Sequence, residues 1–310
     1  MLRILIIRPG AIGDTLLTFP IIQALRAQFE DPRITFVGNA TVLPLAMALG
    51  LVEEVDDYGD LRWSELFSAE GIHTPELCQH LQQTELAICW LRDPDSRVEH
   101  NLRLAGVKQA IVAPGRPPED SRVHVVNYLA ETVGVNKIRM DQVYQIHPHD
   151  TSLPPTRRNK SSSHEQYIAI HPGSGGARKC WPAISFVAVI ELLWQHGYPI
   201  LLLAGPADHE RVSGIRRSLS ASPGPGMLEV LIDAPLVVVA EYLLQCSCYL
   251  GNDSGITHLA AMLGIPTIAL FGPSDPAVWR PLGPHVEVIH KHALENLPVN
   301  MIIESILQRL

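Results

Sequence analysis

The chain is poor in cysteine, and the cysteine that it has excludes two kinds of site. Five cysteines occur among 310 residues, and no two of them are spaced as Cys-x-x-Cys. Neither a zinc site nor a thioredoxin-like redox site is therefore indicated. We expect these side chains to act as small buried apolar groups in a reducing compartment.

Uninterrupted apolar runs and an excess of positive charge are missing as well. Residues 254–274 are uncharged, but glycines and prolines interrupt them, so no membrane span is expected. The N-terminal MLRILIIRPG lacks the features of a signal peptide. The formal net charge of −8 argues against a broad nucleic-acid-binding face. We therefore expect a cytoplasmic protein without a nucleic-acid partner.

What is present is a chain long enough for two domains whose charges differ. A length of 310 residues suits two domains of about 150 residues each. Residues 1–155 carry a formal net charge of −7, and residues 156–310 carry −1. The second half is therefore the more favourable host for a polyanionic small molecule.

Short apolar runs alternate with helical patterns in both halves. The first half has strand-like runs at 3–7, 34–38, 86–91 and 109–113, and helical patterns at 14–29, 41–49 and 124–134. The second half has strand-like runs at 167–173, 199–206, 228–232, 248–251, 266–272 and 286–290, with helices between them. This alternation predicts parallel strands joined by right-handed crossovers.

The alternation stops between about residues 145 and 165, where Pro, Ser and charged residues predominate. We interpret this stretch as a linker; a surface loop inside one large domain is the alternative. The predicted fold is α/β, with two doubly wound domains at residues 1–150 and 151–310. A cleft between facing carboxyl ends of their strands is where such sheets bind ligands.

The first glycine-rich turn, RPGAIGD at residues 8–14, joins a predicted strand to a helix. Gly10 and Gly13 make the turn, but the spacing matches neither a dinucleotide fingerprint nor a P-loop. Asp14 puts a carboxylate where a phosphate would need bare N–H groups. It can cap the helix, a contribution of ~0.5–2 kcal/mol, or it can serve the chemistry of the site.

A second glycine-rich turn, HPGSGGARKCWP at residues 171–182, has the composition of an anion site. Its three glycines and Ser174 expose backbone N–H groups, and Arg178 and Lys179 add positive charge. These features are typical of a phosphate or pyrophosphate site. The alternative is a flexible loop with a solvated basic pair.

The stretch GNDSGITHLAAMLG at residues 251–264 ends one strand and begins a helix. Asp253 or Ser254 can be the N-cap, and the N–H groups that follow can bind an anion. Gly255 lets a ligand approach the backbone closely. His258 lies one helical turn after Ser254, as a packing side chain or a ligand contact.

A further strand exit, AGPADHERV at residues 204–212, offers two carboxylates. Asp208 and Glu210 are candidates for a ribose hydroxyl or for helix capping, and the sequence does not decide between these roles. The loop LFGPSDPAVWRPLGP at residues 270–284 is rich in Pro and Gly, which predicts a rigid connection.

Four stretches together resemble glycosyltransferase family 9, the bacterial heptosyltransferases of lipopolysaccharide core assembly. They are RPGAIGDTLLTFPIIQALR, HPGSGGARKCWPAISF, GNDSGITHLAAMLGIP and LFGPSDPAVWRP, in the family's order along nearly the whole chain. The resemblance implies a GT-B architecture, two Rossmann-like domains with the active site in the central cleft. It also implies an inverting, metal-independent transfer of a sugar, typically from ADP-heptose, onto a lipopolysaccharide-core or related glycan acceptor.

The resemblance also implies roles for individual residues. Asp14 matches the family's proposed catalytic base, on the acceptor-binding first domain. The positions that match donor contacts are Ser174, Lys179, Asp253, Ser254, Gly255 and His258. The ribose-binding carboxylate aligns as either Asp208 or Glu210. No cofactor is expected besides the nucleotide-sugar donor, and at most peripheral contact with the inner face of the cytoplasmic membrane.

This assignment explains the anion in the first turn. The phosphates would bind the second domain, so a carboxylate in the first domain is left to take the proton of an attacking sugar hydroxyl. No DxD-like pair lies beside the phosphate loops, which agrees with metal independence. Lys179 and helix N–H groups would balance the charge of the leaving group instead.

Two matters stay open at this point. A lipopolysaccharide core is strongly anionic, so either Arg8, Arg62, Arg92 and Arg97 gather near the cleft or the acceptor is less charged. A nucleotide-sugar 2-epimerase and a non-catalytic nucleotide-sugar-binding relative are the alternative functions; the second would have no need of Asp14. The missing third glycine disfavours a nicotinamide dehydrogenase, and the sequence indicates no oligomeric state.

Overall fold

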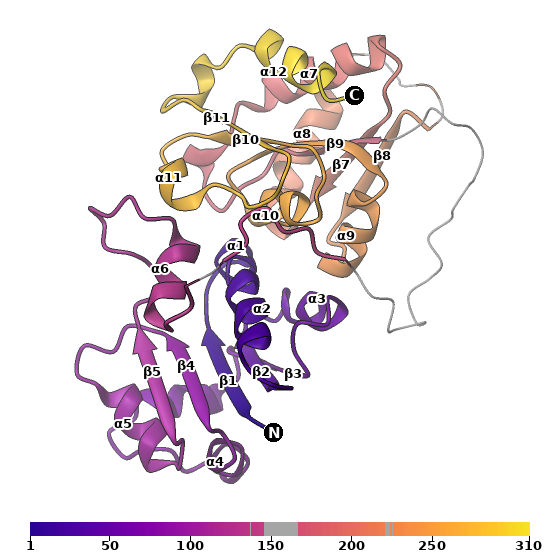
Figure 1. The fold of residues 1–310 in the computed structure, drawn as a ribbon. Coiled ribbons are helices and arrows are strands. Elements are labelled where there is room, and N and C mark those ends of the chain that lie inside the picture. Colours follow the sequence, from indigo (N-terminus) through magenta and orange to yellow (C-terminus); the bar gives the residue numbers. More distant parts are fainter. Residues whose placement is uncertain (137, 146–166, 221–223, 225) are drawn as a thin grey trace. The chain divides into compact units, whose positions relative to one another are not determined.

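The structure is a computed structural model that describes residues 1–136, 138–145, 167–220, 224 and 226–310. These residues form two compact units, Met1–Arg139 and Met140–Leu310 (Figure 1). The predicted domain boundary at residue 150 and nearly all of the predicted linker lie outside the described residues. The boundary therefore stays a prediction.

The first unit is built on a five-stranded sheet in the order β3-β2-β1-β4-β5, with all neighbours parallel. Its strands are β1 (Arg3–Arg8), β2 (Arg33–Gly38), β3 (Glu54–Asp57), β4 (Leu86–Trp90) and β5 (Gln109–Ala113). Its helices are α1 (Ile12–Leu16), α2 (Phe19–Gln28), α3 (Leu43–Ala48), the 3-10 helix η1 (Leu61–Phe67), α4 (Pro75–Gln82), α5 (Arg97–Leu104) and α6 (Val125–Thr132).

Helices cover both faces of this sheet, which is why residues 4–7 of β1 and all of β4 are apolar (Figure 1). Leu5 and Ile7 of β1 belong to one buried cluster with side chains of η1, α4 and α5. On α2, Phe19 packs edge-to-face against Phe36 of β2, with ring centroids 6.4 Å apart. The predicted doubly wound domain is therefore confirmed for this half.

The second unit is built on a six-stranded parallel sheet in the order β11-β10-β9-β6-β7-β8. Its strands are β6 (Tyr167–His171), β7 (Ile200–Ala204), β8 (Leu228–Ile232), β9 (Cys246–Asn252), β10 (Thr267–Phe271) and β11 (Val286–His290). Its helices are η2 (Ala177–Lys179), α7 (Ala183–Gln195), η3 (Pro206–Asp208), α8 (His209–Ser218), α9 (Leu236–Leu243), α10 (Gly255–Met262), α11 (Pro276–Trp279), η4 (Leu294–Asn296) and α12 (Val299–Leu307).

A buried cluster on one face of this sheet joins α7, α8 and α12 to the central strands. Trp181 is fully buried in it and packs edge-to-face on Phe186, with ring centroids 5.1 Å apart. Since Trp181 ends the second glycine-rich turn, this packing anchors the turn to the core.

The two sheets share one topology, which decides where the ligand sites lie. In each, the chain leaves a central strand, β1 or β6, adds two strands on one side, and then crosses to the other side of that central strand. Open α/β sheets bind ligands at such a switch point, outside the carboxyl ends of the strands. Ligand sites are therefore expected at the turns after β1, β6 and β9.

Several local features differ from the prediction, and the helices η1, α4 and α5 were not predicted at all. The helix predicted at 14–29 is divided into α1 and α2, because Pro20 lacks an N–H and is tolerated only in a helix's first turn. Strand β3 was missed: its sequence EVDD is short, acidic and half exposed at the sheet edge.

The cysteines agree with the prediction in part. Cys89, Cys246 and Cys248 are buried, and burial raises the pKa of Cys246 and of Cys248 to about 12. Cys78 and Cys180 are only partly buried.

Two features are absent from the part of the chain that the structure describes. None of its helices is long and apolar enough to cross a membrane. It also contains no group of three or more His, Cys, Asp or Glu side chains that could hold a metal ion.

Candidate active site

Asp14 lies in the first turn of α1, directly after the central strand of the first unit, and is 8% exposed. Its Oδ2 accepts hydrogen bonds from Arg116 Nη2 at 3.1 Å and from the backbone N–H of Ala11 at 3.4 Å. Its Oδ1 accepts one from Arg8 Nη2 at 3.4 Å. The carboxylate thus caps its helix and also forms ion pairs with two arginines.

Arg8 is the last residue of β1 and is only 4% exposed. Burial lowers the pKa of Arg8, and the charge of Asp14 opposes that shift. Among the described residues, Arg8 Nε is buried without a hydrogen-bond partner. A buried guanidinium needs a counter-charge, and Asp14 provides it.

Two glycines are required around this ion pair. Gly10 has φ of +150°, and a Cβ there would lie 2.8 Å from the Cβ of Asp14. A Cβ on Gly115 would lie 2.1 Å from Arg8 Nη1. Gly13, which was predicted to shape the turn, is instead a residue of α1.

In the second unit, the loops after β6 and β9 meet. Lys179 Nζ donates to Asp253 Oδ2 at 2.7 Å; the lysine side chain is 40% exposed and the aspartate side chain 7%. Ser174 Oγ donates to the backbone oxygen of Asp253 at 2.6 Å. Three residues predicted to contact the donor are therefore neighbours in space.

Asn252, the last residue of β9, fixes the glycine-rich turn. Its Nδ2 donates to the backbone oxygen of Pro172 at 2.8 Å, and its Oδ1 accepts from the N–H of Trp181 at 2.9 Å. The fully buried amide thus binds both ends of the turn. The sequence analysis did not single out Asn252, although a polar residue that ends an apolar strand is a signal.

A buried chain of hydrogen bonds connects the ends of β6, β7 and β9. His171 Nε2 lies 3.0 Å from Asp208 Oδ2, and its Nδ1 lies 3.2 Å from Ser254 Oγ. Ser254, and not Asp253, is the N-cap of α10, since its Oγ accepts from the N–H of Thr257. His171, which the sequence analysis also passed over, therefore connects the turn to the helix start.

Burial alone would raise the pKa of Asp208, but its hydrogen bonds and nearby charges outweigh that effect. The hydrogen bond and charge of His171 contribute most, followed by the N–H of Gly205 and the charge of Arg211. The net result is a pKa of Asp208 below its usual value. Asp208 is thus an ionised carboxylate that supports His171.

The remaining candidates differ in their exposure. Asp208 is buried against Gly173, whereas Glu210, in the first turn of α8, is exposed. Gly255 begins α10 and is partly exposed, whereas His258 is 4% exposed. Contacts of these residues with a donor stay predictions.

Three of the four arginines considered for an anionic acceptor, Arg8, Arg62 and Arg97, pair with carboxylates of the first unit. Arg62 forms ion pairs with Asp56 and Asp60, and Arg97 Nη2 lies 2.9 Å from Asp95 Oδ2. The charges of these arginines are therefore already engaged by carboxylates of the same unit.

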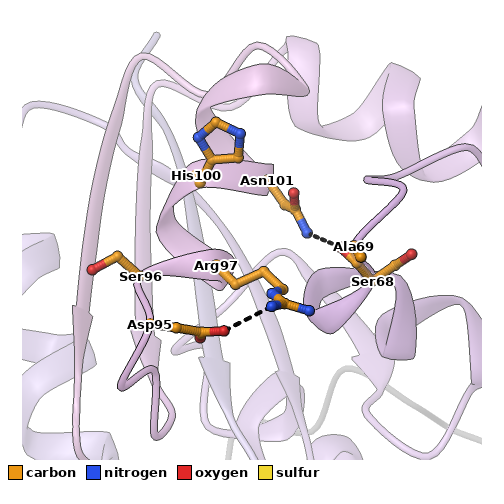
Figure 2. A pocket seen from close by; sticks show the side chains of 7 residues that line it. All are labelled: Ser68, Ala69, Asp95, Ser96, Arg97, His100 and Asn101. Atoms are coloured by element: carbon orange, nitrogen blue, oxygen red, sulfur yellow. Dashed lines mark hydrogen bonds and ion pairs between the residues drawn. The ribbon is translucent and has the colours of Figure 1, made fainter.

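A pocket of about 420 Å³ lies at the start of α5, and Figure 2 shows the side chains that line it. Its lining residues are Ser68, Ala69, Asp95, Ser96, Arg97, His100 and Asn101. Arg97 is engaged with Asp95, and Asn101 donates to the backbone oxygen of Ser68 at 2.8 Å. The pocket brings together none of the residues predicted for catalysis or donor binding.

Comparisons with known proteins identify the class of this fold. Residues 116–302 match the model of glycosyltransferase family 9 (heptosyltransferase). The solved structure of E. coli heptosyltransferase WaaC with ADP is similar with a TM-score of 0.73 and 20% sequence identity, over 100% of both chains. The two parallel-sheet units are those of a GT-B glycosyltransferase.

Two curated heptosyltransferases are similar in sequence. Lipopolysaccharide heptosyltransferase 3 of Escherichia coli is 28% identical over 87% of this chain and 83% of its own length. Lipopolysaccharide heptosyltransferase 2 of Salmonella typhimurium is 30% identical over 41% of this chain, a match that spans only 37% of that relative. Because the family model matches more than half of the chain, the protein belongs to glycosyltransferase family 9, as the four motifs predict.

Proposed function

We propose that the protein is an inverting, metal-independent glycosyltransferase that moves heptose from ADP-heptose onto a lipopolysaccharide-core or related glycan acceptor. The observation that carries the proposal is the buried Asp14 carboxylate, held by Arg8 and Arg116 at the switch point of the first sheet. The names of the two relatives support the heptose and the acceptor, and the ADP in the solved structure of similar fold supports the nucleotide. We place this reaction in the cytoplasm.

Asp14 is the general base in this proposal. It takes the proton of an acceptor hydroxyl while that oxygen attacks the anomeric carbon opposite the diphosphate. The new C–O bond forms as the bond to the phosphate oxygen breaks, and ADP leaves with that electron pair. A single displacement inverts the configuration, and a positioned base accelerates such a step by about 10²–10⁴-fold.

The donor diphosphate binds the second unit. Lys179 has three N–H donors and gives one to Asp253 at 2.7 Å, so two are left for phosphate oxygens. The start of α10, at Gly255, adds backbone N–H groups and the positive end of a helix. Ser174 lies beside them. Together they balance the charge that develops on ADP without a metal ion.

The direct test is a transfer assay with purified protein. ADP-heptose is supplied with a heptose-free lipopolysaccharide core, and ADP release and the glycan product are measured. We expect ADP release only when both substrates are present, with the new bond opposite in anomeric configuration to the donor.

Control donors decide between the alternatives. UDP- and GDP-sugars should give no transfer. Conversion of the nucleotide sugar without an acceptor would indicate an epimerase. Stabilisation against heat by ADP-heptose without any turnover would indicate a binding protein.

A further inference from the structure

We infer that Arg8 is the positioning residue for the general base, and that Asp14 takes the acceptor proton on Oδ1. The inference rests on the proposed function, since it assigns a role beside the proposed base. The sequence suggests Arg8 only as one of four arginines for an anionic acceptor, not as a partner of Asp14.

The first observation is the unequal anchoring of the two arginines. Arg8 belongs to the central strand β1, and its side chain is 5% exposed; the side chain of Arg116 is 67% exposed. A guanidinium fixed on a sheet can hold a carboxylate in one orientation, whereas an exposed one loses much of that effect to solvent. Arg8 is thus the partner that can preorganise Asp14.

The second observation is that Arg8 is poorly satisfied for a buried cation. Besides Asp14, its guanidinium reaches only the backbone oxygen of Pro9, at 3.5 Å, among the described residues, and its Nε has no partner there. An unsatisfied buried donor destabilises a fold. A buried apolar side chain would serve the fold better, so we attribute the arginine to the site.

The third observation is the division of donors between the carboxylate oxygens. Oδ2 accepts from Arg116 and from the N–H of Ala11, whereas Oδ1 accepts from Arg8 at 3.4 Å. A carboxylate oxygen has two lone-pair sites. Oδ1 therefore keeps more capacity for a new hydrogen bond, and Arg8 defines the direction from which a hydroxyl can approach.

Gly115 allows this geometry to be tested without removing a charge. The backbone at Gly115 lies so close to Arg8 that an added Cβ would be 2.1 Å from Nη1 and 2.9 Å from Cζ. Gly115→Ala therefore moves the guanidinium, whereas Arg8→Met removes it. Arg8→Lys keeps a charge but not the planar fork.

The test measures kcat and KM for heptose transfer across pH in these variants. We expect Arg8→Met and Gly115→Ala to lower kcat by about 10–100-fold with little change in the KM for ADP-heptose, since small misplacements have effects of this size. Arg8→Lys should lower kcat by a smaller factor, because it keeps a positive charge. Arg103→Met, in an exposed pair with Glu99, and Gly214→Ala, with open space around it, are matched controls.

The pH profile separates positioning from a general loss of structure. The groups that face Asp14 are Arg8 from β1, Arg116 from the segment after β5 and the N–H of Ala11. Loss of the buried cation makes the carboxylate harder to ionise. In Arg8→Met the acidic limb of kcat/KM should therefore move to higher pH, and in Arg8→Lys it should stay nearer that of the wild type.

A double-mutant cycle gives the decisive outcomes. In an Asp14→Asn background, Arg8→Met should cause no further loss. If Arg8→Met lowers kcat by the same factor in the Asp14→Asn background as in the wild type, the positioning role of Arg8 is overturned. The same holds if Arg8→Met and Gly115→Ala keep the kcat and pH profile of the wild type. Neither outcome overturns the proposed base. Full turnover of Asp14→Asn would overturn the proposed base and this inference with it. If Arg8→Met fails to fold, as judged by circular dichroism, Arg8→Lys and Gly115→Ala decide.

Discussion

The turns after the two central strands carry one pattern and different chemistry. Strand β1 ends in Arg-Pro-Gly at residues 8–10 (the RPG turn), and β6 ends in His-Pro-Gly at 171–173 (the HPG turn). The first residue of each is buried and faces a carboxylate, which is Asp14 in the RPG turn and Asp208 in the HPG turn. The glycine of each packs against that carboxylate, too close for a Cβ.

The two turns differ in the segment that supplies the carboxylate and in the charged group that lies beside the turn. Asp14 belongs to the segment that continues the RPG turn, and it is the carboxylate that Arg8 and Arg116 bind there. Asp208 comes from the end of the neighbouring strand β7 and binds His171 and the N–H of Gly205, so Lys179 supplies the charge beside the HPG turn. If the proposed function holds, the same turn serves a general base in the first unit and an anionic ligand in the second, depending on the side chains beside it.

The sharpest test of this comparison removes the charge from the RPG turn. Asp14→Asn keeps the size and most of the capping but cannot take a proton, so kcat should fall by about 10²–10⁴-fold. Donor affinity should change little, whereas the melting temperature should fall, because the buried Arg8 loses its counter-charge; kcat is therefore measured well below the melting temperature. The assay is heptose transfer, with ADP binding measured by calorimetry.

The capping alternative makes the opposite forecast for the same residue. If Asp14 only caps α1, Asp14→Asn keeps its turnover, and Asp14→Ala destabilises the protein by about 1 kcal/mol. Near-full turnover of Asp14→Asn with a verified donor and acceptor would end the assignment of the base.

The sequence predicted the fold well because its strands are buried apolar runs between punctuating glycines and prolines. It failed at β3, whose EVDD has no apolar pattern, and at Pro20, where a continuous helical pattern hides a break. These are positions where local pattern and tertiary context disagree.

The sequence predicted those residues of the candidate site that stand in recognisable motifs, but not their partners. Asp14 and Lys179 stand in recognisable turns, but Arg116 is separated from Asp14 by 102 positions, and His171 from Ser254 by 83. Arg8 and Asn252 are defined by burial and partners, which a sequence without its fold does not display. What the sequence lacked was the pairing between distant strand ends.

The next prediction concerns the packing of the HPG turn. A Cβ on Gly173 would lie 1.9 Å from Asp208 Oδ1, so Gly173→Ala should lower the free energy of unfolding by about 1–3 kcal/mol. Gly175, in the same turn, has open space, and Gly175→Ala should stay within about 0.5 kcal/mol. Urea denaturation measures both, and equal stability of the two variants would contradict the packing.

The two carboxylates near β7, Asp208 and Glu210, should differ in their contribution to stability. Asp208→Ala leaves a buried ring nitrogen of His171 without its partner and should destabilise the protein by about 1–3 kcal/mol at pH 7. Glu210→Ala, on the exposed first turn of α8, should leave stability within about 0.5 kcal/mol. Thermal unfolding compares them; an ordinary melting temperature for Asp208→Ala would contradict the role of Asp208.

Acid should remove the stabilisation that the ionised Asp208 carboxylate provides. The pKa of Asp208 is below its usual value, so its ionised form stabilises the fold at neutral pH. That stabilisation is lost as the pH falls below about 4 and through the folded-state pKa. The stability difference between wild type and Asp208→Ala should therefore shrink with acid, as measured by denaturation at several pH values. A difference that grows towards low pH would contradict the sign.

The last prediction concerns the charge beside the HPG turn. Lys179→Ala should weaken ADP binding by about tenfold at low salt, and the loss should shrink as salt screens the lysine. Part of the loss comes from Asp253, whose side chain is 7% exposed and would keep its negative charge beside the diphosphate without the lysine. Lys179→Ala combined with Asp253→Asn should therefore bind ADP more tightly than Lys179→Ala alone. Lys291→Ala, which removes an exposed lysine bonded to the backbone oxygen of Asn296, is the control. Unchanged ADP affinity of Lys179→Ala at low salt, measured by calorimetry, would remove Lys179 from the donor site and with it the contrast between the two turns.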